Sequence, residues 1–129
     1  MHDAQAIPEQ LQQVMQTLED LRSRAQSANP DGRSLQHRFL TAQQICQQTL
    51  LPEAMARSHL VPHATEITRA LRLLAMDVSF LQASRQPMTR QKRQAEICDR
   101  CDRLLGYCQA MLAQWDAPPA HPGQNPTES

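Results

Sequence analysis

Apolar residues recur at intervals of three and four along most of this chain, the spacing that places side chains on one face of an α-helix. The pattern is strongest over residues 67–87. Its apolar positions are Ile67, Ala70, Leu71, Leu73, Leu74, Val78, Phe80 and Leu81. Because this stripe covers more than half of the helix circumference, it predicts a helix with neighbours on several sides, at the centre of a bundle.

Three further stripes of the same kind predict three further helices. The four expected helices lie at about residues 8–28, 33–50, 62–86 and 90–115. Prolines and turn-forming residues separate them, at residues 29–32, 52–62 and 87–89. Because the connections are short, consecutive helices become antiparallel neighbours. The sequence therefore predicts an all-α fold, an antiparallel four-helix bundle in which the third and fourth helices are the longest.

Single residues mark the expected helix ends. Gly32 can adopt the positive φ of a turn, Pro52 interrupts the second helix, and Thr89 is placed to cap the fourth. Residues 52–61 have room for one helical turn before Pro62 opens the third helix. If this connection straightened instead, the first two helices would pack on another copy of the chain, giving a swapped homodimer.

The chain has 129 residues, enough for one domain with a core of its own. We place that domain at residues 1–117 and expect a disordered, proline-rich tail at residues 118–129. Thirteen basic side chains balance thirteen acidic ones, so the composition favours neither nucleic acid nor a membrane surface as a partner. No apolar run approaches the roughly 20 residues of a membrane span, and no secretory signal begins the chain, which indicates the cytoplasm.

The cysteines are the first candidate for chemistry. Cys98 and Cys101 have the C-x-x-C spacing, with Cys108 further along the same helix and Cys46 as another candidate ligand. Zinc sites of this type need a second close pair, and none is present. The three cysteines alternate with leucines in the apolar stripe of the fourth helix, where cysteine behaves as a small buried hydrophobe. We therefore expect three buried, reduced thiols without metal.

Signatures of catalysis are missing from the sequence. It contains no phosphate-binding loop, no nucleophile motif and no H-E-x-x-H pair of zinc ligands. His59 and His63 are four residues apart, but Pro62 between them starts a helix and keeps the two from sharing one helix face. The sequence predicts neither enzymatic activity nor a cofactor.

Asp77 lies on the flank of the buried stripe of the third helix. A half-buried carboxylate needs a partner, and an arginine or Tyr107 of the fourth helix is placed to supply it. We interpret Asp77 and Tyr107 as a candidate structural polar pair that fixes the register of the two helices. Catalysis would need a second acid–base group, and none is evident.

Basic side chains gather where the third and fourth helices meet. They are Arg85, Arg90, Lys92 and Arg93. Further along, Glu96–Arg100 and Asp99–Arg103 have the i, i+4 spacing of helical ion pairs. We interpret the four basic residues as a candidate contact with an acidic surface of a protein partner, the alternative being ordinary solvated surface. On this interpretation, reversing Arg90 and Arg93 to Glu should leave the melting temperature nearly unchanged.

A resemblance to a known family is carried by three stretches, Leu71–Pro87, Arg93–Glu96 and Asp102–Leu112. Together they are similar to the cyanobacterial heterocyst frequency control protein family, also called PatD, over about residues 70–112. The resemblance implies a small cytoplasmic all-helical regulator. Its implied partner is the tubulin-like cell-division GTPase FtsZ, and its implied effect is on division and heterocyst patterning. The cysteine series, residues 59–63 and the tail depart from the family.

Two functional hypotheses of different classes follow. The first is a non-enzymatic interaction protein that acts on the division machinery through FtsZ. The second is a helical bundle that binds a metal or a small ligand through Cys98, Cys101 and Cys108, as other bundles house sites between their helices. A zinc or iron assay on the purified protein separates the two.

Overall fold

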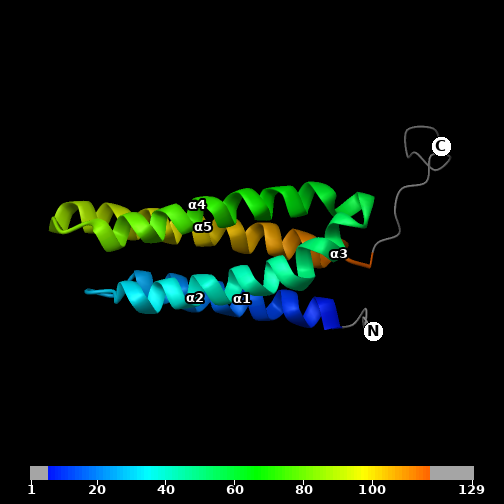
Figure 1. The fold of residues 1–129 in the computed structure, drawn as a ribbon, viewed down its shortest axis with the longest axis horizontal. Coiled ribbons are helices and arrows are strands. Elements are labelled where there is room, and N and C mark those ends of the chain that lie inside the picture. The colour runs from blue at the N-terminus through cyan, green and yellow to red at the C-terminus, as the bar shows by residue number, and fades with distance from the viewer. Residues whose placement is uncertain (1–5, 117–129) are drawn as a thin grey trace.

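The computed structural model describes residues 6–116. Its four long helices are α1 (Ala6–Ala25), α2 (Gly32–Ile45), α4 (Val61–Ala83) and α5 (Pro87–Gln114). They run alternately up and down, with α1 and α2 in one layer and α4 and α5 in the other (Figure 1). The predicted all-α bundle is confirmed, and α4 and α5 are its longest helices, with 23 and 28 residues. The tail expected at residues 118–129 lies outside the described residues.

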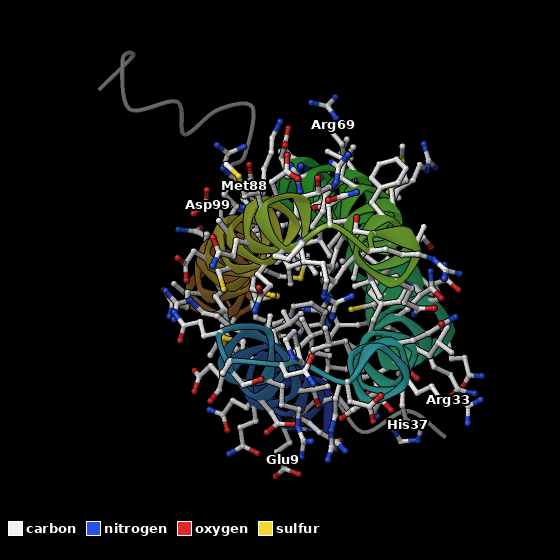
Figure 2. All side chains as sticks on the ribbon, turned by 90° about the vertical axis from the view of Figure 1, so that its left-hand side faces the viewer. Glu9, Arg33, His37, Arg69, Met88 and Asp99 are labelled. Atoms are coloured by element: carbon white, nitrogen blue, oxygen red, sulfur yellow. The ribbon has the colours of Figure 1, made fainter. Side chains whose placement is uncertain are left out.

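Seen end-on, the helices stand at the corners of a square (Figure 2). Each contacts its two neighbours, in the order α1, α2, α4, α5 and back to α1. Apolar side chains from all four fill the centre as one cluster. Its fully buried members include Leu11, Leu18, Leu21, Leu35, Ile67, Leu74, Ile97 and Trp115. The contact between α2 and α4 is the sparsest of the four, so two helical hairpins are joined chiefly through α1 and α5.

Helix α4 buries most of the stripe predicted for it. Ile67, Leu74 and Leu81 are fully buried at the centre of the bundle. Phe80 differs, because it lies at the edge of the stripe and 42% of it remains exposed. Phe80, predicted to extend the apolar stripe on one side, therefore lies outside the core, and its position places an aromatic ring at the outer border between α4 and α5.

Pro52 does not interrupt the helical course of the chain in the way predicted. The backbone continues from α2 through a π-helical turn, η1 (Cys46–Leu50), into the short helix α3 (Leu51–Met55). In a regular α-helix the proline ring would clash with the carbonyl four residues earlier, and its missing N–H would leave that carbonyl unbonded. The wider π turn takes up this mismatch. A 3₁₀ turn, η2 (Ser58–Leu60), then leads into α4.

The connection between the two hairpins folds back within one chain. The Arg57 guanidinium lies over the Trp115 ring, 4.8 Å from its centroid, and its Nη1 donates to the Trp115 carbonyl at 3.2 Å. The Nε2 atom of His59 lies 3.0 Å from the carbonyl oxygen of Gln114. These contacts hold the connection against the end of α5, so the α4–α5 hairpin packs on the α1–α2 hairpin of the same chain.

The turn between α1 and α2 is capped by a side chain. The Asp31 carboxylate accepts the backbone N–H of Arg33 at 3.2 Å, which satisfies a free donor at the start of α2. The predicted positive φ at Gly32 is wrong, since no glycine adopts one in the part of the chain that the structure describes. Gly32 serves another purpose: a Cβ there would lie 2.8 Å from Cγ of Gln82 on α4. The absent side chain therefore permits the close approach of the two helices.

The turn between α4 and α5 lies three residues earlier in the chain than predicted. Helix α4 ends at Ala83, and α5 begins at Pro87 rather than at Arg90. The proline expected to end one helix starts the next, because its fixed φ suits the first helical position, where no N–H is needed. Thr89 thus lies inside the first turn of α5, and the N-cap position belongs to Gln86.

Candidate functional site

Arg90, one of the four basic residues at the α4–α5 corner, is bound to three backbone carbonyls. Its Nη1 donates to Leu81 at 3.3 Å and Ser84 at 3.1 Å, and its Nη2 donates to Pro30 at 3.4 Å. The last carbonyls of a helix lack intrahelical partners, so these bonds stabilise the end of α4 and join it to the α1–α2 turn. Arg90 is therefore part of the fold. The expectation that its reversal leaves the melting temperature unchanged no longer holds.

Arg93 is also engaged within the protein. Its Nη1 lies 3.0 Å from Oε1 of Glu96, and its guanidinium lies 4.7 Å from the centroid of the Phe80 ring. Glu96 thus pairs with the arginine three residues before it, in place of the predicted pair with Arg100. The stacked guanidinium covers one side of the exposed aromatic ring.

Gln94 supports the same corner, although no signal in the sequence singles it out. Its Nε2 donates to the carbonyls of Ala25 and Ser27, both at 2.9 Å. Both carbonyls belong to the C-terminal end of α1 and the turn after it. The first turns of α5 therefore bind the ends of both α4 and α1.

Two of the four predicted contact residues, Arg85 and Lys92, are not engaged by the part of the chain that the structure describes. Both are exposed, and neither forms an ion pair among residues 6–116. Met88 lies one helical turn before Lys92 on the same face of α5 and is 84% exposed. We call Arg85, Met88 and Lys92 the corner surface.

Asp77 is the one buried charged residue within the described range, at 7% exposure. Nε of Arg100 donates to its Oδ2 at 3.0 Å. The Arg100 side chain is 22% exposed and the Asp77 side chain 10%. The prediction that an arginine of the fourth helix pairs with Asp77 is confirmed. The more specific pair with Tyr107 is wrong. The ion pair fixes how α4 and α5 lie against each other, because an unpaired carboxylate at this depth would be costly.

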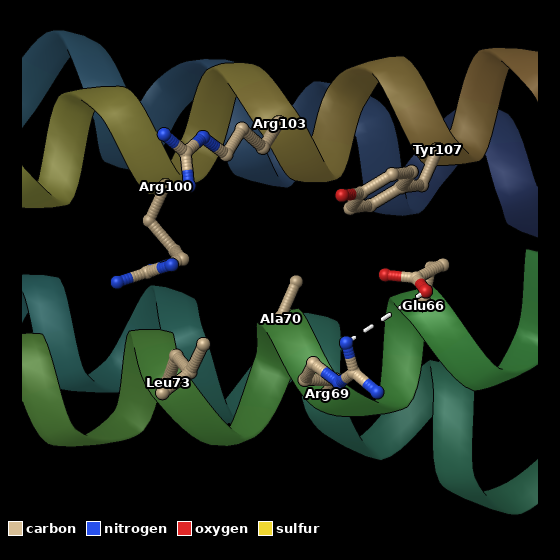
Figure 3. A pocket seen from close by; sticks show the side chains of 7 residues that line it. All are labelled: Glu66, Arg69, Ala70, Leu73, Arg100, Arg103 and Tyr107. Atoms are coloured by element: carbon tan, nitrogen blue, oxygen red, sulfur yellow. Dashed lines mark ion pairs between the residues drawn. The ribbon is translucent and has the colours of Figure 1, made fainter.

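Arg100 also lines a cleft of about 160 Å³ between α4 and α5 (Figure 3). We call it the α4–α5 cleft. Its lining residues are Glu66, Arg69, Ala70, Leu73, Arg100, Arg103 and Tyr107. In Figure 3, Arg100 reaches from α5 toward α4, while the Glu66 carboxylate and the Tyr107 ring face the space between the helices. The prediction placed Tyr107 beside Asp77; the structure places it in this cleft.

In the lining of the α4–α5 cleft, arginine side chains outnumber carboxylates. Nη1 of Arg69 lies 3.9 Å from Oε1 of Glu66, too far for a hydrogen bond. Arg103 is exposed, and the ion pair predicted for it with Asp99 is not formed; within residues 6–116 it pairs with no other carboxylate. Guanidinium groups arranged in this way can receive an anionic group through charge-assisted hydrogen bonds.

The cysteines are free thiols that the bundle largely covers. Cys46, Cys101 and Cys108 are buried, and burial raises the pKa of each to about 12. Cys98 is only half-buried, contrary to prediction, and its thiol donates to the Arg22 carbonyl at 3.8 Å. Burial also raises the pKa of Cys98. Because the thiolate is the nucleophile and the metal ligand, thiols with raised pKa values are poorly suited to either task at neutral pH.

The described side chains form no site that fits the metal-binding hypothesis. Across residues 6–116, no three His, Cys, Asp or Glu side chains come together in a way that could hold a metal ion. His59 contacts the end of α5, whereas His63 lies in the first turn of α4. The alternative built on Cys98, Cys101 and Cys108 therefore has no support from the described side chains.

Comparison of the chain with protein-family models, with curated proteins and with solved structures found no match. No helix in the described part of the chain combines the length and the apolar character needed to cross a membrane. The fold and the surface together define an all-α bundle whose α4–α5 side carries, at its corner and in its cleft, cationic groups without an ion-pair partner among residues 6–116.

Proposed function

We propose that this chain is a non-enzymatic cytoplasmic regulator that acts by binding a protein partner. Following the resemblance to the PatD family, we propose FtsZ as that partner and an influence on cell division, and with it heterocyst patterning, as the outcome. The observation that carries the proposal is the corner surface. It combines two cationic side chains without partners among the described residues and an apolar side chain that is 84% exposed.

The three residues of the corner surface have complementary properties for binding. A single exposed apolar residue is ordinary on a soluble protein, but a flexible methionine can adapt to a partner's apolar surface. Flanking cations steer an acidic partner toward the site and affect mainly the association rate and its salt dependence. The nearby Arg90 and Arg93 support the proposal indirectly, because their internal contacts give the corner a fixed shape.

Binding of purified FtsZ to the full chain, measured by biolayer interferometry at several salt concentrations, tests the proposal. We expect binding that weakens as salt rises, since surface charges are screened over about 10 Å at 0.1 M salt. The double variant Arg85→Glu/Lys92→Glu should bind more weakly than the parent. The matched control is Arg33→Glu/Arg72→Glu, which makes the same change in net charge at two exposed arginines outside the corner.

Two results would count against the proposal. Absence of FtsZ binding at low salt would remove FtsZ as the partner. Equal weakening by the corner variant and its control would mean that only net charge matters, and the corner surface would then be ordinary solvated surface. Thermal melts of each variant check that the fold is intact, because surface substitutions usually change stability by less than about 0.5 kcal/mol.

A further inference from the structure

We infer that the α4–α5 cleft receives a carboxylate side chain from an acidic segment of the partner protein. The carboxylate would be held by Arg69, Arg103 and the hydroxyl of Tyr107. This inference rests on the proposed function for the existence of a partner. It rests on the cleft alone for the chemistry of that partner.

The polar groups of the cleft are mostly donors without a complete set of acceptors. Arg103 forms no ion pair within residues 6–116, and Arg69 has only the 3.9 Å contact with Glu66. The Tyr107 hydroxyl makes no hydrogen bond to the described part of the chain, and its ring faces the cleft. A carboxylate is an acceptor only, with two oxygens that match a guanidinium fork and a phenolic O–H.

Arg100 has a different role in the cleft. Its Nε is held by Asp77 at 3.0 Å, so its guanidinium forms a fixed part of the wall. That bond also neutralises most of its charge. The attraction for an incoming anion therefore comes mainly from Arg69 and Arg103, which lie on opposite walls, one on α4 and one on α5.

The size of the cleft limits what can occupy it. Its volume is about 160 Å³, whereas pockets for drug-sized ligands and cofactors have roughly 300–1,000 Å³. Ala70 and Leu73 add apolar surface to the lining, which suits the methylene groups of an acidic side chain. One aspartate or glutamate side chain fits this space better than a whole small-molecule ligand.

The cleft and the corner surface lie along one side of α5. Lys92 and Arg103 are separated by about three helical turns, or about 16 Å along the axis, and therefore face the same direction. Glu96 and Asp99 lie between them; Glu96 is paired with Arg93 at 3.0 Å, whereas the exposed Asp99 forms no ion pair among residues 6–116 and opposes part of the attraction. About five residues of extended chain span that distance. An acidic segment of this length would contact the corner surface at one end and place a carboxylate in the cleft at the other.

A fluorescein-labelled peptide of eight glutamates is a suitable probe, since it is longer than the required span. Its binding to the full-length chain is measured by fluorescence anisotropy in about 20 mM salt, where screening is weak. Arg69→Glu/Arg103→Glu should weaken binding about tenfold. The control Arg33→Glu/Arg72→Glu makes the same charge change and should weaken it less than about threefold. Tyr107→Phe, which removes only the hydroxyl, should weaken it by about threefold.

Each outcome decides the matter. Loss of binding specific to the cleft variants supports the inference, and equal loss in cleft and control variants overturns it, as does failure of the parent to bind the peptide. Stronger competition by inorganic phosphate than by sodium chloride of equal ionic strength would overturn the acidic segment in favour of a phosphate site.

The FtsZ assay separates the two proposals. If FtsZ binding responds to the corner variant and not to the cleft variant, the proposed function stands and the cleft inference fails. If the peptide binds in the cleft but FtsZ does not bind, the cleft inference stands and FtsZ fails as the partner.

Discussion

The α1–α2 hairpin carries four acidic and four basic side chains over residues 6–45, and the α4–α5 hairpin carries five acidic and eight basic ones over residues 61–114. Local pairing increases this difference. In the first hairpin Asp20 bonds both Arg24 at 2.8 Å and Arg38 at 2.9 Å. In the second, Asp102 is paired with Arg22 of α1 at 2.6 Å, so one of its few acidic groups neutralises the other hairpin. The cationic surplus of α4–α5 is thus larger than its composition implies.

The two hairpins also differ in how their turns are stabilised. The α1–α2 turn has a local cap, the Asp31 carboxylate on the next helix. The α4–α5 turn has no side-chain cap at the start of α5, and α5 instead sends Arg90 and Gln94 to the ends of α4 and α1. One turn is held by its own sequence and the other by contacts between distant segments. Such long-range contacts give the chain beside the corner surface a defined shape.

Both hairpins bury their apolar faces in the same core. The two hairpins therefore differ in surface charge but not in how they contribute to the core. Surplus cations along one side of a bundle add little to stability, since exposed charges contribute little and repel one another when they share a sign. The proposed binding role accounts for their presence on the α4–α5 side. Three predictions test whether the two hairpins depend equally on the common core and differ in their polar contacts.

The largest effect is expected from alkaline pH, which acts on thiols from both hairpins. Burial raises the pKa of Cys46, Cys101 and Cys108 from 9.0 to about 12. Their protonated forms therefore stabilise the folded state fully below pH 9, and this stabilisation is lost as the pH rises from 9 toward 12. At pH 10 each thiol should lower the free energy of unfolding by about 1 kcal/mol. Urea denaturation at pH 8 and pH 10 under reducing conditions measures the sum.

A cysteine variant separates the thiols from other groups that titrate at high pH. Cys108→Ala lowers stability at both pH values through lost packing. Its loss between pH 8 and pH 10 should nevertheless be smaller than that of the parent, by about the share of one thiol. Equal losses would mean that the Cys108 thiol ionises as easily in the fold as in the unfolded chain.

The second prediction compares the main ion pair of each hairpin. Arg100→Ala leaves the Asp77 carboxylate buried without a partner and should destabilise the protein by about 2–3 kcal/mol. Asp20→Ala removes two ion pairs, but Asp20 is 42% exposed, so the expected loss is below about 1 kcal/mol. Denaturant midpoints at neutral pH compare the two.

The double variant Asp77→Ala/Arg100→Ala provides the control for this comparison. Removing both partners leaves no buried charge behind, so the double variant should recover part of the loss caused by Arg100→Ala. Equal costs for Arg100→Ala and Asp20→Ala would show that the Asp77 carboxylate reaches water in the folded protein. The contrast between the two hairpins would then disappear at this point.

The helices were predictable from the sequence because packing repeats with the period of the backbone. Leu11, Leu18 and Leu74 occupy stripe positions and are fully buried. Helix ends are harder to predict, because one residue type can have two roles. Pro87 was expected to stop a helix and instead starts one, and Pro52 is tolerated through a π turn. Both outcomes obey the known constraints on proline, but the choice between them depends on tertiary packing.

The site was predictable only as far as single helices determine it. Asp77 lies on the flank of its stripe, and this position alone indicated partial burial and a partner on the fourth helix, either an arginine or Tyr107. Which arginine pairs with it depends on the register between α4 and α5, which no local pattern specifies. Arg90 shows the same limit, since one of its acceptors is the carbonyl of Pro30, sixty residues earlier in the chain. The cleft brings residues of two helices together and has no signal in either one.

The smallest effect is expected from two glycines, one in each hairpin. Gly106 lies in α5, and a Cβ there would meet nothing within 4 Å. Gly106→Ala should therefore stabilise the protein by about 0.5–1 kcal/mol, the usual gain from replacing a glycine inside a helix. At Gly32 the same Cβ would lie 2.8 Å from Cγ of Gln82, whose Nε2 donates to the Gly32 carbonyl at 3.2 Å and to Oε1 of Gln36 at 2.7 Å. Gly32→Ala must displace that side chain and should give no gain, or a small loss.

Denaturant midpoints of the two variants measure this difference, and Gln82→Ala supplies the control. If the clash with Gln82 is the reason, Gly32→Ala should be better tolerated in the Gln82→Ala background than in the parent. If Gly32→Ala stabilises the parent as much as Gly106→Ala does, Gln82 moves aside freely. The bonds from Gln82 to α2 would then contribute little, and the already sparse contact between α2 and α4 would be a loose boundary between two hairpins that α1 and α5 hold together.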